Sequence, residues 1–134
     1  LPSSVSIIDR MAIARIEELG IRTNGYLVTA YVGDDCDACM IVHGYRGGSV
    51  TNSEKWPLST SFYSNSFLHK SGGKFDLTKL ATAFDKDGGG HANACGCRVQ
   101  PLSRNGILES REVTEEDIER NVEAWLQIWA TRDS

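Results

Sequence analysis

The segment of the chain best suited to chemistry is the run DGGGHANACG at residues 87–96, where three glycines precede a histidine. Glycine has no Cβ, so Gly88, Gly89 and Gly90 let a ligand approach the backbone, and successive N–H groups can converge on a phosphate oxygen. His91 supplies a directional hydrogen-bond donor beside them. A flexible surface loop is the alternative, but the small residues that follow favour a tightly packed turn or short helix. The run therefore predicts a phosphate-binding cradle.

The segment before the glycines predicts a helix. Leu77, Leu80, Ala81 and Phe84 recur at the spacing of one buried helical face. We therefore expect the glycines to end a helix.

This succession of a helix, GGGH, two variable residues and a small-small-Gly triplet resembles the DHH-associated C-terminal domain of the DHH phosphoesterases. That family includes single-strand exonucleases, nano-RNases that degrade very short oligonucleotides, 3′-phosphoadenosine phosphatases and cyclic-dinucleotide phosphodiesterases. The resemblance is strongest over residues 75–99, extends to residues 25–64 and stops near Gln100.

The resemblance implies a domain that binds the nucleotide, while a separate preceding domain holds two Mn or Mg ions and hydrolyses a phosphodiester or phosphomonoester. The implied phosphate contacts are Gly88, Gly89, Gly90 and His91, with weaker polar contacts from Asn93 and Ser64. The implied partners are a short single-stranded oligonucleotide or a small nucleotide, and the N-terminal catalytic domain. Since the chain begins with Leu1 rather than methionine, we expect a domain excised from a longer enzyme.

We expect no catalytic residue and no metal ligand in this chain. Two-metal hydrolysis needs several aspartate and histidine ligands that hold ions about 4 Å apart. The sequence contains no Asp-His-His run and only three histidines. The isolated chain is therefore expected to be inactive.

The sequence departs from the family in a second motif. The family has a strand ending in Ser-x-Arg-Ser, and the nearest match is Ser61-Phe62-Tyr63-Ser64. Tyr63 replaces an arginine that would form charge-assisted bonds with a phosphate. A tyrosine can instead stack on a base, which contributes about 1–3 kcal/mol in single-strand binding sites, or be an ordinary half-buried strand residue. Arg46 and Lys55, in an expected exposed loop over residues 43–57, are candidates to replace the missing charge.

Composition is typical of one globular domain that binds a small ligand. The chain has 134 residues, 40% of them hydrophobic, and a net charge of −4. Residues 109–134 carry eight acidic and three basic side chains, so residues 1–108 have a net charge of +1. Such a balance argues against coating long nucleic acids and suits a small phosphate ligand or a short oligonucleotide. No apolar run approaches the ~18 residues of a membrane helix, and we expect a cytoplasmic protein.

Four cysteines form two close pairs, Cys36 with Cys39 and Cys95 with Cys97. Two short Cys motifs can assemble a structural zinc site, but most such sites have Cys-x-x-Cys on both sides. We expect Cys95 to fill a packing position and all four residues to be metal-free thiols.

The pattern along the chain predicts a single α/β domain, a small mixed sheet flanked by helices, with helices at both ends. A helix is expected from about Ser4 to Leu19, ended by Gly20. Strands are expected over residues 26–32, 39–42, 58–63 and 97–99, with the first two as neighbours, and a turn over residues 101–106. We divide the domain into an N-terminal helix and linker (1–24), a nucleotide-binding core (25–100) and a C-terminal extension (101–134).

The C-terminal helix has the clearest signals. Thr114 and Asp117 fit a capping box, Val113 and Ile118 fit a hydrophobic staple, and one face carries apolar residues at helical spacing, namely Ile118, Val122, Trp125 and Trp129.

Two other functions stay open at this point. One is a nucleotide-binding or interaction module without catalysis in any context, and the other is a cysteine-based metal module. The sequence also leaves open the substrate (oligonucleotide, cyclic dinucleotide, phosphoadenosine or polyphosphate), the cleavage polarity and the oligomeric state.

Overall fold

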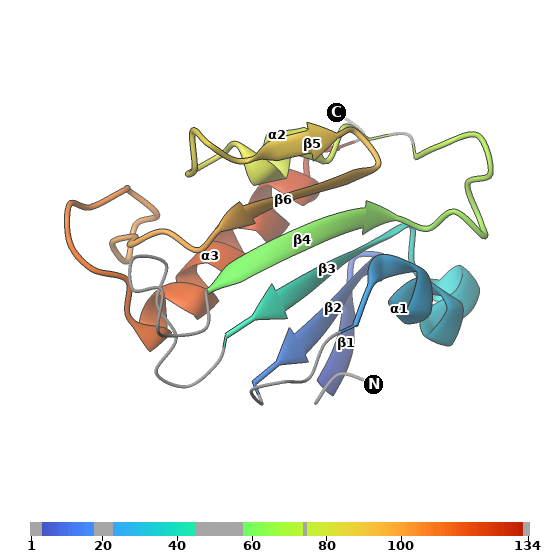
Figure 1. Ribbon diagram of the computed structural model, residues 1–134, viewed down its shortest axis with the longest axis horizontal. Helices are drawn as coiled ribbons and strands as arrows, with labels where there is room; N and C mark the ends of the chain where they lie inside the picture. Colours follow the sequence, from blue (N-terminus) through green and yellow to red (C-terminus); the bar gives the residue numbers. More distant parts are fainter. Residues whose placement is uncertain (1–3, 18–22, 45–57, 74, 133–134) are drawn as a thin grey trace.

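The computed structural model describes residues 4–17, 23–44, 58–73 and 75–132. These residues form a six-stranded sheet with the order β1-β2-β3-β4-β6-β5 (Figure 1). Its strands are β1 Ser4–Ile8, β2 Met11–Ile16, β3 Ala38–His43, β4 Ser59–Ser64, β5 Gly89–His91 and β6 Ala94–Arg98. β2 and β3 run parallel, and the other neighbours run antiparallel. The predicted α/β domain with a small mixed sheet is confirmed.

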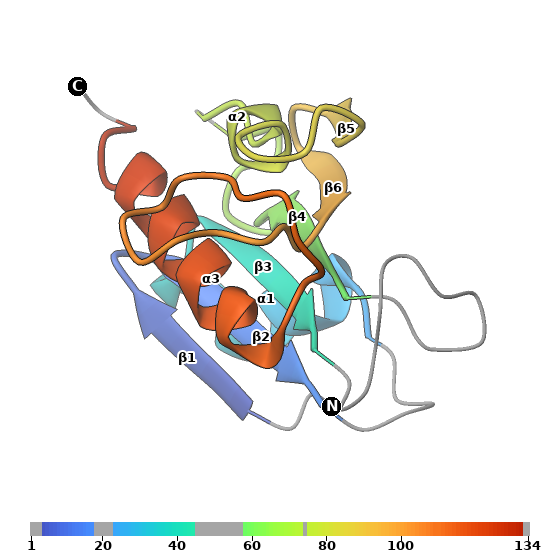
Figure 2. The same cartoon turned by 90° about the vertical axis from the view of Figure 1, so that its left-hand side faces the viewer.

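Helices cover both faces of the sheet. Helix α1 (Gly25–Val32) lies on one face, and α2 (Thr78–Ala81) and α3 (Glu115–Trp129) lie on the other (Figure 2). Alternate strand residues divide between two cores, because successive side chains of a strand point to opposite faces. Met11 and Met40 belong to the core under α2 and α3, whereas Ala12 and Cys39 belong to the core under α1.

The N-terminal helix predicted from Ser4 to Leu19 is wrong, because the described part of this segment is a β-hairpin. β1 and β2 pair antiparallel across a two-residue turn in which Asp9 and Arg10 have φ of 50° and 64°. Five of the six residues of β2 are buried, since both of its faces are covered. A strand buried on both faces has no polar alternation, so its apolar run resembles a buried helix.

The strand predicted over residues 26–32 is also wrong, and so is its pairing with residues 39–42. These residues form α1, which connects β2 to the parallel strand β3. The helix begins after Asn24, whose side chain accepts a hydrogen bond from the N–H of Leu27 at 2.9 Å. Tyr, Val and Thr favour strands locally, but packing of the buried Val28 and Thr29 stabilises a helix here.

Other predicted elements are confirmed with small shifts. The strands expected over 39–42 and 58–63 are β3 and β4, and the strand expected over 97–99 is the longer β6. Leu77, Leu80 and Ala81, which the sequence predicted to share a buried helical face, are buried. The helix itself, α2, is only one turn long. The turn near residue 106 and the capping box of α3 are present. Most of the loop expected over 43–57, with Arg46 and Lys55, lies outside the described residues.

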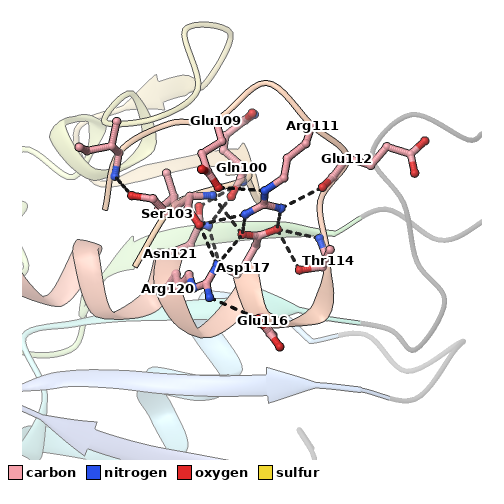
Figure 3. A network of polar contacts seen from close by, with 12 residues as sticks. Gln100, Ser103, Glu109, Arg111, Glu112, Thr114, Glu116, Asp117, Arg120 and Asn121 are labelled. Atoms are coloured by element: carbon pink, nitrogen blue, oxygen red, sulfur yellow. Dashed lines mark hydrogen bonds and ion pairs between the residues drawn. The ribbon is translucent and has the colours of Figure 1, made fainter. Parts of the chain in front are cut away.

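A polar network fastens residues 102–114, the segment before α3, to the first turn of that helix (Figure 3). Asp117 is fully buried and accepts two hydrogen bonds of 2.8 Å from the Arg111 guanidinium. The same carboxylate accepts from the backbone N–H groups of Leu102 and Thr114 at 3.0 and 2.7 Å. Burial opposes the charged carboxylate, but these hydrogen bonds outweigh it and hold the pKa of Asp117 well below its usual value.

Candidate functional site

The glycine run opens an edge strand rather than ending a helix. Helix α2 ends at Ala81, whereas Gly89–His91 form β5, which turns through Ala92 and Asn93 into β6. The prediction that the glycines end a helix is therefore wrong. Three glycines carry no periodicity from which a strand can be inferred. β5 is an edge strand with β6 as its one neighbour. Some of its backbone N–H and C=O groups therefore form no hydrogen bond within the sheet.

The three glycines differ in what surrounds them. A Cβ on Gly88 would lie 2.2 Å from the carbonyl oxygen of Ala81, and a Cβ on Gly90 would lie 2.9 Å from Cys95 Cα. These two glycines are required for packing. A Cβ on Gly89 would meet nothing within 4 Å, and the residue has φ of +150°. Of the three, Gly89 is the one whose backbone is open to a ligand.

Strand register places His91 and Tyr63 on the same face of the sheet. Ala94 pairs with Tyr63 on one side and with His91 on the other, and directly paired residues point to the same face. Two residues further along, Gly96 pairs with Ser61 and with Gly89. Tyr63 packs in the core under α1, so this is the α1 face. We call these six residues the open β-surface: Ser61, Tyr63, Gly89, His91, Ala94 and Gly96.

Small residues make most of this surface shallow. Helix α1 covers β2, β3 and β4. His91 on β5 and Ala94 on β6 are exposed. Backbone atoms of β6 and β5 therefore lie near the surface, with His91 as the ionisable side chain at the edge. A ligand on this surface can contact the exposed imidazole of His91 and approach the backbone of β5 at Gly89.

A cleft of about 600 Å³ adjoins the open β-surface at Tyr63. Its walls come from the first turn of α1, the end of β4, the segment after β4 and the β5–β6 turn. The described residues that line it are Asn24, Gly25, Tyr26, Thr29, Tyr63, Ser64, Ser66, His69, Lys70, Gly72 and Asn93. The structure thus brings together three predicted site residues, Tyr63, Ser64 and Asn93, whereas Gly88, Gly89, Gly90 and His91 lie on or beside the neighbouring edge strand.

Asn93 fixes the β5–β6 turn against β4. Its side-chain oxygen accepts hydrogen bonds from the Ser64 hydroxyl and the Gly73 N–H, both at 2.9 Å. Its backbone oxygen accepts from the Ser64 N–H at 3.0 Å. Ser64 and Asn93 therefore hold the turn in place, a structural role that the sequence did not reveal.

Tyr63 joins the cleft to α1. Its ring lies directly against Gly25, where a Cβ would come within 2.2 Å of the ring atom Cγ. Tyr63 is half-buried in this position. The aromatic side chain of Tyr63 therefore forms one wall of the cleft.

Sequence reasoning missed the other eight cleft residues, among them Asn24, His69 and Lys70. Asn24 was detectable as a helix cap only if residues 25–32 had been recognised as a helix.

His69 Nε2 lies 2.9 Å from Asp37, which also pairs with Arg10 at 2.8 Å. The Arg10 guanidinium and the His69 ring hold the pKa of Asp37 below its usual value. This chain of contacts ties the segment after β4 to the start of β3.

Asp85 anchors the chain just before β5. Its carboxylate is 3% exposed and accepts hydrogen bonds from the Arg98 guanidinium at 3.0 and 3.1 Å and from the N–H groups of Arg98 and Asp87 at 3.0 Å. The guanidinium of Arg98 and these N–H groups lower the pKa of Asp85 to about 2. The position of β5 thus depends on an ionised Asp85.

Acid should remove the contribution of Asp85 to stability. An unfolded aspartate has a pKa of about 3.9, so the contribution is fully present above about pH 4 and is lost as the pH falls through about 2. We expect Asp85→Asn to lower the free energy of unfolding by about 2 kcal/mol at pH 7 and by far less at pH 2. Urea unfolding at both pH values measures this difference. A loss that is equal at pH 7 and pH 2 would show that the charge of Asp85 is not the cause.

The two cysteine pairs lie on opposite faces of the sheet. Cys36 and Cys39 belong to the core under α1, whereas Cys95 and Cys97 pack with the core under α2 and α3. The sheet therefore separates the pairs, which argues against one four-cysteine zinc site. Burial raises the pKa of Cys36 and Cys95 to about 11 and that of Cys39 and Cys97 to about 12. Burial therefore favours the protonated thiol at all four positions.

Among the described residues, no three His, Cys, Asp or Glu side chains form a group that could hold a metal ion. The Mn or Mg ions implied by the sequence resemblance therefore find no fitting site among the described residues.

No helix in the described part of the chain has the length and hydrophobicity needed to cross a membrane.

Two solved structures share this fold. A pGpG-specific phosphodiesterase, PggH from Vibrio cholerae, aligns with a TM-score of 0.59 and 16% identity over 94% of this chain and 35% of its own. An exopolyphosphatase-related protein from Bacteroides fragilis aligns with a TM-score of 0.57 and 16% identity over 98% of this chain and 34% of its own. This chain thus spans about a third of each neighbour. The likeness, at 16% identity, shows a shared fold. No protein-family model matches the sequence, and the search of curated proteins gives no significant match.

Proposed function

We propose that this chain is the substrate-binding domain of a DHH-type phosphoesterase and that its open β-surface binds a short single-stranded oligonucleotide or a small nucleotide. His91 donates a hydrogen bond to a phosphate oxygen, and Gly89 lets that phosphate approach the backbone of β5. Tyr63, at the edge of the surface, contacts a base.

One observation carries this proposal: the register that puts His91, Ala94 and Tyr63 in one row across β5, β6 and β4. The row combines a phosphate donor and an aromatic side chain around residues with little or no side chain. The fold similarity to a phosphodiesterase and to an exopolyphosphatase-related protein supports the same class of ligand.

Hydrolysis itself is assigned to residues outside this chain. The described residues bring together no metal-binding group, and two-metal hydrolysis depends on such a group. We propose that the Mn or Mg ions bind in a catalytic domain that precedes this one in the full-length protein. His91 then stabilises negative charge on the phosphate during the reaction.

Replacing His91 with alanine tests the binding role. A hydrogen bond to a charged group contributes about 1.5–3 kcal/mol, so we expect roughly tenfold to hundredfold weaker binding of a dinucleotide by isothermal titration calorimetry. Since His91 is exposed, the melting temperature should change little. Unchanged affinity, or a variant that melts far earlier than the parent, would remove His91 as the phosphate contact.

A binding module without catalysis in any context is the second candidate, because Tyr63 replaces a charged family residue. The upstream coding sequence distinguishes the two. An Asp-His-His motif preceding Leu1 supports the phosphoesterase, and its absence supports the binding module.

A further inference from the structure

The two edges of the described sheet differ in how they are protected against pairing with another sheet. β5 has only three residues, and very short edge strands are one of the devices that prevent such pairing. β1, at the other edge, has five residues, none of them charged and none a proline. Its register with β2 runs one to one without a bulge, and Ile7 and Ile8 are 45% and 49% exposed. Among the described residues, β1 is therefore an unprotected edge.

Two hydrogen bonds establish which way the backbone groups of β2 point. The N–H of Asp37 bonds to the oxygen of Arg10 at 2.8 Å, and the N–H of Gly44 bonds to the oxygen of Ile16 at 3.0 Å. Backbone groups alternate in direction along a strand, so the even-numbered residues of β2 turn theirs toward β3. The odd-numbered residues turn theirs toward β1.

The strand register carries this alternation into β1. The odd-numbered residues of β2 have their partners in β1, as the pairs Met11–Ile8, Ile13–Ser6 and Arg15–Ser4. The N–H and C=O groups of Val5 and Ile7 point away from β2 instead, and no described strand or loop pairs with them there. The outer edge of β1 thus presents two donors and two acceptors on residues that are two positions apart.

We propose that β1 pairs antiparallel with β1 of a second copy of this chain, about a two-fold axis through Ser6. In this register Val5 of each copy lies opposite Ile7 of the other, and each of these pairs exchanges two hydrogen bonds. All the outward groups of Val5 and Ile7 are then satisfied. The pairing also sets two β-branched side chains directly across from each other, which is a favourable cross-strand contact.

The charges around β1 favour an identical strand as the occupant. Each charged residue of the β1–β2 hairpin is in an ion pair within its own chain, namely Asp9 with Arg132, Arg10 with Asp37 and Arg15 with Glu119. Two hairpins can therefore meet without uncompensated like charges opposite each other. Because β1 itself is uncharged, it offers a charged strand of another protein no complementary group.

The size of the contact predicts a weak dimer. Stable protein interfaces bury about 800 Å² per partner over roughly 20–30 residues, and β1 contributes five residues. We therefore expect a dissociation constant on the order of 10–100 μM.

This pairing is independent of the proposed function. β5 lies at the opposite edge of the sheet from β1, so the open β-surface of each copy stays free at the two ends of the joined sheet. The effect of His91→Ala on nucleotide binding is therefore expected to be the same in monomer and dimer.

Sedimentation velocity, over concentrations from below to above the expected dissociation constant, measures the association of the parent, Ile7→Pro and Ile7→Thr. Proline at position 7 removes an outward N–H and no hydrogen bond between β1 and β2, and edge strands tolerate proline in this orientation. Threonine is the matched control, because it is β-branched and keeps the N–H. Melting temperatures verify that each variant is folded. If Ile7→Pro does not fold, Ile7→Lys replaces it, since lysine on an edge strand opposes pairing.

We expect the parent and Ile7→Thr to form dimers as the concentration rises. Ile7→Pro should associate at least about tenfold more weakly, because two hydrogen bonds are lost per dimer, one in each copy. The same result is expected for Ile7→Lys.

Amide hydrogen exchange, followed by NMR at the same concentrations, locates the interface. The amides of Ser6 and Ile8 bond to β2, so their protection should not depend on concentration. The amides of Val5 and Ile7 should exchange rapidly in the dilute protein and become protected as the dimer forms.

Three results overturn this inference: a parent that stays monomeric throughout, a dimer in which the amides of Val5 and Ile7 stay unprotected, or equal association of Ile7→Pro and the parent. Protection of Val5 and Ile7 in a monomer at every concentration also overturns it, because the occupant of the edge is then a segment of the same chain.

Discussion

Replacing Asp117 with alanine is expected to lower the free energy of unfolding by about 3–5 kcal/mol. The substitution leaves the Arg111 guanidinium without its bidentate partner and two backbone N–H groups without an acceptor (Figure 3). A domain of this size is stable by only about 5–15 kcal/mol, so the variant should unfold at much lower urea concentration. Tryptophan fluorescence reports the transition, because Trp125 and Trp129 are buried on the same helix.

Glu116→Ala is the control for this experiment. Glu116 is the preceding residue in the first turn of α3, so it has a similar position in the helix dipole, but its side chain is 79% exposed. Exposed ion pairs contribute about 0–1 kcal/mol, and the expected loss is of that size. If Asp117→Ala is no more destabilising than Glu116→Ala, the buried network does not stabilise the packing of residues 102–114 on α3 as described.

Gly25→Ala is expected to destabilise the domain by about 2–3 kcal/mol, as overpacking does. Alanine normally stabilises a helix relative to glycine by about 0.5–1 kcal/mol, so the expected sign is the reverse of helix propensity. The cause is the Tyr63 ring, whose Cγ would lie 2.2 Å from the new Cβ. Either the Tyr63 ring or helix α1 must therefore move, and either movement alters a wall of the cleft.

A double-mutant cycle identifies the cause. In a Tyr63→Gly background both the ring and the Tyr63 Cβ, which would lie 2.5 Å from the new Cβ, are gone. Gly25→Ala should then be neutral or stabilising by up to about 1 kcal/mol. Urea unfolding of the parent, both single variants and the double variant measures the coupling. An equal cost of Gly25→Ala in both backgrounds would exclude Tyr63 as the cause.

The sequence predicted elements whose signals are local. Thr114 and Asp117 are spaced as a capping box, and α3 begins there. Ile118, Val122 and Trp125 recur on one helical face, and all three are buried.

Elements determined by long-range packing were missed. β2 is buried on both faces, so Met11, Ala12 and Ile13 show no alternation of polar and apolar residues. α1 consists largely of residues that favour strands, and its helical state depends on the contact with β2, β3 and β4. Propensity is a weak guide where tertiary contacts decide the structure.

For the candidate site, the residue types were recognisable but their arrangement was not. Gly88 and Gly90 are packed against other residues, whereas Gly89 is not. The sequence does not distinguish the three glycines, because their neighbours, Ala81 and Cys95, come close only in the folded chain. The common face of His91 and Tyr63 follows from the register of three strands. The cleft residues Lys70 and Asn24 lie far from the glycine motif in sequence.

The most direct test of the proposed function is an NMR titration of the ¹⁵N-labelled chain with a dinucleotide. We expect saturable shifts of the backbone amides of Gly89, His91, Ala94 and Gly96, while the amides of α3, on the other face of the sheet, stay unchanged. Shifts confined to α3, or no shifts at millimolar dinucleotide, would contradict a nucleotide-binding role for the open β-surface.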